Sequence, residues 1–122
     1  MEDDLHSFLP LSPATLHILL SLAGEDLHGY GIMQEVARQS EGKYKLGPGT
    51  MYDNLQKLIQ REWVEELGRR AGDEDPRRRY YRLTLAGQGV LEAEIARLAE
   101  VVREGRARLQ TARPSNAKPR RA

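Results

Sequence analysis

The sequence predicts a mainly α-helical fold with one small β-hairpin and a long C-terminal helix. Its 122 residues leave room for one domain. Apolar residues recur at helical spacing in four segments, and two short segments rich in aromatic and β-branched residues lie between the third and the fourth. The fourth helical pattern is the longest, and it follows the second short segment directly.

The first helix is predicted to begin at Ser12 and Pro13 and to stop at Gly24. Serine is a favoured N-cap because its hydroxyl accepts a backbone N–H, and proline fits the first helical position because its missing N–H costs nothing there. Residues 1–10 lack periodicity, so we expect a frayed or partly ordered lead-in. The apolar face, which we expect to be mostly buried, comprises Leu16, Ile18, Leu19, Leu20, Leu22 and Ala23.

Two more helices follow. The second starts after residues 27–31 and ends near Gly42, and segment 43–46 then alternates charge and bulk, which predicts a brief strand. A Gly-Pro-Gly-Thr turn over residues 47–50 leads into the third helix. The residues expected to point inward are Ile32, Met33, Val36 and Ala37 on the second helix, and Met51, Leu55, Leu58 and Ile59 on the third.

The remaining elements are a hairpin and a long helix. Residues 63–67 and 79–84 are predicted strands around a charged polar loop, and Thr84 caps a helix that runs to about Leu109. A helix-turn-helix followed by a β-hairpin is a winged helix-turn-helix. We therefore divide the chain into a lead-in (1–10), a winged helix-turn-helix domain (11–84), a dimerisation helix (85–110) and a basic, disordered tail (111–122).

Three segments carry a resemblance to a known family. They are Leu-His-Gly-Tyr-Gly-Ile at 27–32, Gly-Pro-Gly-Thr-Met-Tyr at 47–52, and Arg-Tyr-Tyr-Arg-Leu-Thr at 79–84, with Gly87 just beyond. Over about residues 11–110 the chain resembles the PadR family of bacterial transcriptional regulators. The resemblance implies a homodimeric repressor that binds operator DNA and is often released by a small ligand.

The chain departs from that family at two points. Gly47 stands where the family often has serine, so the cap of the third helix is weaker here. Some multidrug-binding relatives place a tryptophan on the final helix, whereas the one tryptophan of this chain is Trp63, on a predicted strand. The ligand chemistry of those relatives is therefore not carried over.

The third helix is the candidate for the DNA major groove, which admits one α-helix. Its outward stripe supplies an amide that pairs with adenine and an ammonium that contacts guanine or phosphate, while Asp53 is an awkward neighbour for phosphates. The turn before this helix and the arginines of the hairpin are candidate phosphate contacts. The predicted DNA-binding residues are Lys43, Lys45, Gly49, Thr50, Tyr52, Asp53, Asn54, Lys57, Arg77, Arg78 and Arg79.

Plainer interpretations stay open for these residues. Residues 47–49 could form an ordinary turn, the helix face could simply be solvated, and the hairpin arginines could pair with the acidic residues 73–75 at its tip. We expect the Tyr52 hydroxyl to bond a phosphate because its helix neighbours already fill the inward face. The remaining tyrosines and the tryptophan are expected in the core: Tyr30, Tyr44, Tyr80, Tyr81 and Trp63.

The final helix carries an apolar heptad seam, which predicts a homodimer. A lone helix of this length would leave the seam in water, unless its first half packs on its own domain. The seam residues are Leu91, Ile95, Leu98, Val102, Gly105 and Leu109.

Composition excludes several other functions. Positive charge gathers after residue 42, because residues 1–42 hold one basic and seven acidic side chains although the net charge of the chain is +1.

There are no cysteines and no apolar run long enough for a membrane span, and the start is acidic, so we expect a cytoplasmic protein. His6, His17 and His28 lack metal-ligand spacing, so we expect neither an enzyme nor a cofactor. The alternative function is a winged-helix adaptor that binds other proteins and not DNA.

Overall fold

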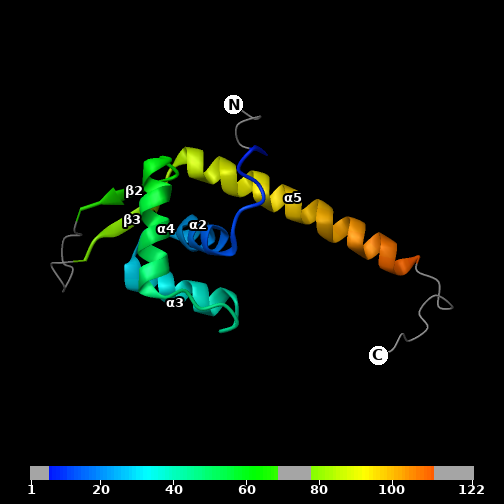
Figure 1. Ribbon diagram of the computed structural model, residues 1–122, viewed down its shortest axis with the longest axis horizontal. Coiled ribbons are helices and arrows are strands. Elements are labelled where there is room, and N and C mark those ends of the chain that lie inside the picture. The colour runs from blue at the N-terminus through cyan, green and yellow to red at the C-terminus, as the bar shows by residue number, and fades with distance from the viewer. Residues whose placement is uncertain (1–5, 69–77, 112–122) are drawn as a thin grey trace.

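The computed structural model describes residues 6–68 and 78–111 (Figure 1). Its elements, in chain order, are α2 (Pro13–Gly24), β1 (Leu27–His28), α3 (Gly29–Gln39), α4 (Pro48–Gln60), β2 (Val64–Leu67), β3 (Tyr80–Leu83) and α5 (Leu85–Gln110). The strands form one antiparallel sheet in the order β1-β3-β2, with Leu27 opposite Tyr81 and Val64 opposite Leu83. The mainly helical fold with a small hairpin and a long last helix is confirmed.

The helix starts agree with the capping residues. The Ser12 hydroxyl accepts the Thr15 N–H at the start of α2, and the Thr84 hydroxyl accepts the Gly87 N–H at the start of α5. Gly47 precedes α4 and makes no side-chain cap. Each of these bonds joins residues three positions apart, so the local sequence is sufficient to predict them.

The strand predicted over residues 43–46 is wrong. The Tyr44 N–H donates to the Ser40 hydroxyl (3.0 Å), and Glu41 and Gly42 have φ angles of 55° and 79°, so the chain turns tightly after α3. The third strand is instead β1, just before α3, which pairs with β3. Its partner lies more than 50 residues further along the chain, so no local pattern indicates it.

The described part of the lead-in, residues 6–10, makes contacts with the rest of the domain. The Phe8 ring lies edge-on to Trp63, with centroids 5.0 Å apart, and the Leu9 N–H donates to the His6 carbonyl. The Leu11 N–H donates to the carboxylate of Glu94 on α5. These contacts fix residues 6–11 against α5 and the end of α4.

The core lies among α2, α3, α4, the hairpin and the first half of α5. The prediction that Tyr30 is a core residue is wrong, because its side chain is 61% exposed. Tyr44 and Tyr80 are half-buried, and Tyr81 and Trp63 are buried as expected. The buried apolar side chains include Ile18, Leu19, Ile32, Val36, Met51, Leu55, Leu58, Val64 and Val90.

The second half of α5 leaves the domain. In Figure 1 it extends away from every other element, and residues 99–111 are exposed along their whole length. No helix among residues 6–68 and 78–111 has the length and apolar character needed to cross a membrane.

Candidate nucleic-acid interface

Helix α4 packs one face on the core and leaves the opposite face in solvent. Met51, Leu55 and Leu58 are buried, and α4 contacts α2, α3 and β2. Figure 1 shows it lying beside the hairpin. The predicted contact residues Gly49, Thr50, Tyr52, Asp53 and Lys57 are all exposed on it.

Asn54 differs from the other predicted contact residues of α4. Its side chain is half-buried, and its amide nitrogen donates to the Thr50 carbonyl at 2.8 Å. The Thr15 hydroxyl of α2 donates to the amide oxygen at 3.5 Å. The Asn54 amide therefore already has partners within the domain and lies toward α2, away from the centre of the exposed face.

The Tyr52 hydroxyl lies directly against the start of α3. A methyl group added at Gly29 would overlap that hydroxyl, so the Tyr52 side chain would have to shift to admit one. The same hydroxyl opens into a surface hollow that is also lined by His28, Tyr30, Arg78 and Arg79. The orientation of the His28 ring is fixed by a hydrogen bond, because its Nδ1 accepts the Gly31 N–H at 3.1 Å.

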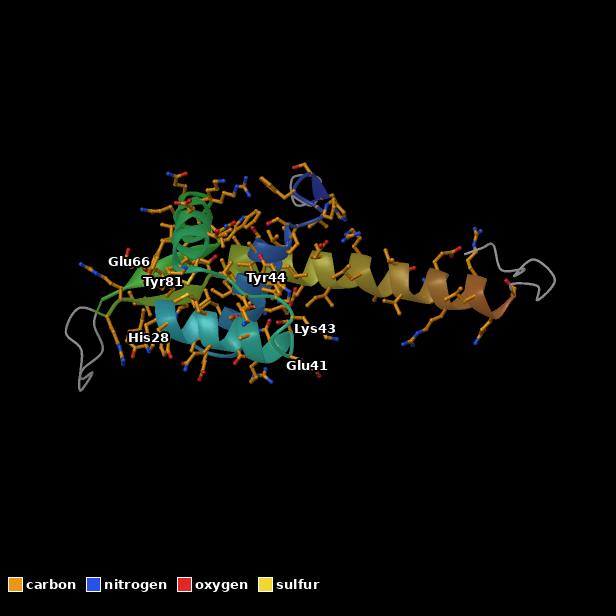
Figure 2. The ribbon with its side chains drawn as sticks, turned by 60° about the horizontal axis from the view of Figure 1, so that its bottom comes forward. His28, Glu41, Lys43, Tyr44, Glu66 and Tyr81 are labelled. Carbon is orange, nitrogen blue, oxygen red and sulfur yellow. The ribbon has the colours of Figure 1, made fainter. Side chains whose placement is uncertain are left out.

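The loop end of the hairpin, where Leu67 pairs with Tyr80, brings arginines to this hollow. Arg78 and Arg79 are exposed, and Arg79 lies 3.6 Å from the Glu66 carboxylate on β2. Such an exposed pair contributes little stability and can exchange partners. Figure 2 shows Glu66 and Tyr81 close together on the hairpin. Burial, and then the charge of Glu66, raises the pKa of the Tyr81 hydroxyl, which therefore stays protonated at neutral pH.

The remaining predicted contacts are not gathered at this hollow. Lys43 and Lys45 are exposed in the loop between α3 and α4, and Figure 2 shows Lys43 at the opposite end of α3 from His28. Arg77 and the acidic tip of the hairpin, residues 73–75, lie outside the described residues. Arg82 faces elsewhere, because its guanidinium pairs with Asp26 at 3.0 Å.

The heptad seam of α5 divides into two parts. Leu91 is only 4% exposed and packs in the core of its own domain. Its side chain is therefore not part of the exposed seam, contrary to the expectation from the heptad pattern. Leu98 is half-buried, and Gly105 is exposed. Ile95 (47% exposed), Val102 (49%) and Leu109 (77%) present apolar surface to solvent in the isolated chain.

Sequence reasoning missed three residues that matter here. Thr15 and Glu94 are buried polar groups. Each has one partner three positions away, but the partners that join them to other elements lie 39 and 83 positions away, so no local signal marks those contacts. Gln56 is exposed on α4, three positions from Asp53, and helical spacing could have indicated it. No group of three histidine, aspartate or glutamate side chains able to hold a metal ion occurs in the described part of the chain.

The geometry defines a class: a winged helix-turn-helix, with an exposed third helix beside a hairpin. The family model described as "Transcriptional regulator PadR-like family" matches the sequence over residues 18–93. This chain belongs to that PadR-like family of transcriptional regulators. A transcriptional regulator of Mycobacterium tuberculosis is 35% identical over 89 residues, which cover 73% of this chain and 78% of that protein.

Two solved structures share the fold. A PadR family transcription regulator from Clostridium difficile superposes with a TM-score of 0.69 at 22% identity, covering 80% of this chain and 99% of that one. PadR of Bacillus subtilis, solved in complex with operator DNA, gives a TM-score of 0.61 at 21% identity, covering 70% of this chain and 47% of that one. At these identities the likeness concerns the fold alone.

Proposed function

We propose that this chain represses transcription as a homodimer that binds an inverted-repeat operator. The observation that carries the proposal is the apolar stripe of Ile95, Val102 and Leu109, which α5 leaves exposed beyond the domain. Exposed apolar side chains at heptad spacing are covered when a second helix packs against them. A second copy of the chain supplies a helix with the same stripe.

The DNA contacts follow from the exposed face of α4. This helix enters the major groove, where Asp53 accepts a hydrogen bond from cytosine and Lys57 contacts guanine or a phosphate. Tyr52, Arg78 and Arg79 surround the hollow at the loop end of the hairpin and bind the sugar–phosphate backbone. Arg79 leaves Glu66 for a phosphate in this arrangement, since their contact is exposed.

A two-fold dimer presents two copies of α4 to the same duplex. The half-sites then lie about one helical turn, or a multiple of it, apart in an inverted repeat. Occupied operator DNA within a promoter excludes the transcription machinery, which gives repression.

Release by a small molecule, which the family resemblance implies, acts through α5. A ligand that changes the angle between the two α5 helices changes the distance between the two α4 helices and lowers the affinity for a fixed half-site spacing. An inducer that leaves both spacing and affinity unchanged would rule out this route.

The test is fluorescence polarisation with DNA from upstream of the gene, at two salt concentrations. We expect specific binding that weakens steeply with salt, with a slope of log K against log salt of about −0.9 for each phosphate neutralised. A scrambled duplex of the same length is the control and should bind more weakly at both concentrations. No binding to either duplex would favour the protein-binding adaptor and overturn the proposal.

A further inference from the structure

We propose that Gln56, and not Asn54, is the amide side chain with which α4 recognises an adenine in each half-site. The inference rests on the proposed function, because it assigns specificity within the same DNA interface. It concerns one residue that the sequence pattern did not single out.

Asn54 is poorly placed for that contact. A paired contact to adenine needs both the amide N–H and the amide oxygen of the side chain. In Asn54 the nitrogen donates to the Thr50 carbonyl at 2.8 Å, and the oxygen accepts from Thr15 at 3.5 Å. The half-buried amide lies toward α2, so turning it out to DNA would break both bonds and leave the buried Thr15 hydroxyl without its Asn54 acceptor.

Gln56 has the same chemical group in an open position. Its side chain is exposed and makes no hydrogen bond with another side chain of residues 6–68 or 78–111. It lies one helical turn from both Asp53 and Tyr52, which are also exposed. It also lines a shallow surface pocket between α4 and the hairpin, together with Tyr52 and Glu66. Gln56 thus lies between Asp53, the proposed contact to a DNA base, and the proposed phosphate contacts at the loop end of the hairpin.

A second glutamine on α4 provides an internal comparison. Gln60 is exposed as well, but it is the last residue of α4, a full turn beyond Gln56. Helices of this class contact bases chiefly with residues nearer their N-terminus, and Gln56, the ninth residue of α4, lies one turn nearer to it than Gln60. The two residues share side-chain chemistry, exposure and helix, and differ only in depth along the helix.

The experiment selects preferred sites from a pool of randomised duplexes with the wild-type chain and single variants. We expect Gln56→Ala to lower the preference for adenine at one position of each half-site by about 5- to 150-fold. Gln56→Glu should move the preference there from adenine to cytosine, because a carboxylate only accepts hydrogen bonds. Gln60→Ala and Asn54→Ala should keep the wild-type preference at every position.

The opposite pattern overturns the inference. If Gln56→Ala and Gln56→Glu select the wild-type site while Asn54→Ala loses the adenine, the contact belongs to Asn54. If Gln60→Ala loses the adenine, the contact lies deeper along α4. Circular dichroism of each variant separates a lost contact from a lost fold. Failure of the wild-type chain to select any site would instead overturn the proposed function.

Discussion

The backbone N–H of Leu11 donates a hydrogen bond to the carboxylate of Glu94, 3.1 Å away and 83 positions along the chain. Glu94 is 1% exposed, and its other partner is the Arg97 guanidinium at 2.7 Å. This bond attaches the segment just before α2 to α5, near the point where α5 leaves the domain. A buried carboxylate with charged and N–H partners makes the stability of the domain depend on pH.

Acidification should destabilise the fold through Glu94. The hydrogen bond from Arg97, and then the one from Leu11, holds the pKa of the Glu94 carboxyl below its ordinary value of 4.5 in the folded chain. Glu94 therefore stabilises the fold above that ordinary value, and the contribution is lost as the pH falls through the lowered pKa. Urea unfolding between pH 3 and 7 should show Glu94→Gln with a flatter acid limb than wild type.

A nearby carboxylate provides the control for that measurement. Glu92 lies on the same helix and is exposed, so Glu92→Gln removes the same charge from a solvated position. Its acid limb should match that of the wild-type chain. Equal curves for Glu94→Gln and Glu92→Gln would contradict the role given to Glu94.

Because α5 packs closely against the backbone at Trp63, adding a methyl group at Gly87 should destabilise the fold. A Cβ at Gly87 would overlap the Trp63 carbonyl oxygen, which is backbone and cannot move aside alone. Gly87→Ala should therefore lower the free energy of unfolding by about 1–3 kcal/mol. Gly105→Ala, on the same helix with open space around its Cβ in the isolated chain, should raise the free energy of unfolding of the monomer by about 0.5–1 kcal/mol. Chemical denaturation measures both, and equal signs would refute the packing argument.

The contact between the lead-in and α4 can be measured as a coupling energy. The Arg61 guanidinium lies 5.0 Å from the Phe8 ring centroid and 5.1 Å from that of Trp63. A double-mutant cycle of Phe8→Ala and Arg61→Ala should give an interaction of about 0.5–1 kcal/mol, as for exposed cation–π pairs. Strictly additive effects on stability would show that Phe8 packs on Trp63 alone.

The proposed dimer is tested by two adjacent valines of α5. Val101 and Val102 are 55% and 49% exposed, but the heptad seam includes only Val102. Val102→Glu would place a carboxylate from each subunit in the apolar interface and should raise the dimer Kd by more than about 100-fold. Val101→Glu should leave dimerisation nearly unchanged. Sedimentation velocity distinguishes these outcomes, and a monomeric wild-type chain would refute the proposal outright.

Much of this protein follows from the sequence by itself. The caps at Ser12 and Thr84, the apolar faces of the helices, the two hairpin strands and the length of α5 are all set by residues a few positions apart. Hydrogen-bond caps and helical periodicity act over one or two turns, so a linear pattern contains them.

Tertiary structure decided the rest. The strand at Leu27 and His28, the attachment of Leu11 to Glu94 and the engagement of Asn54 by Thr15 all join distant parts of the chain. Such pairings depend on how whole elements pack, because a polar side chain bonds whichever group packing brings within about 3 Å. For that reason the sequence could place Asn54 on the outward stripe of a helix, but only the packing of α2 against α4 showed that its amide already has partners.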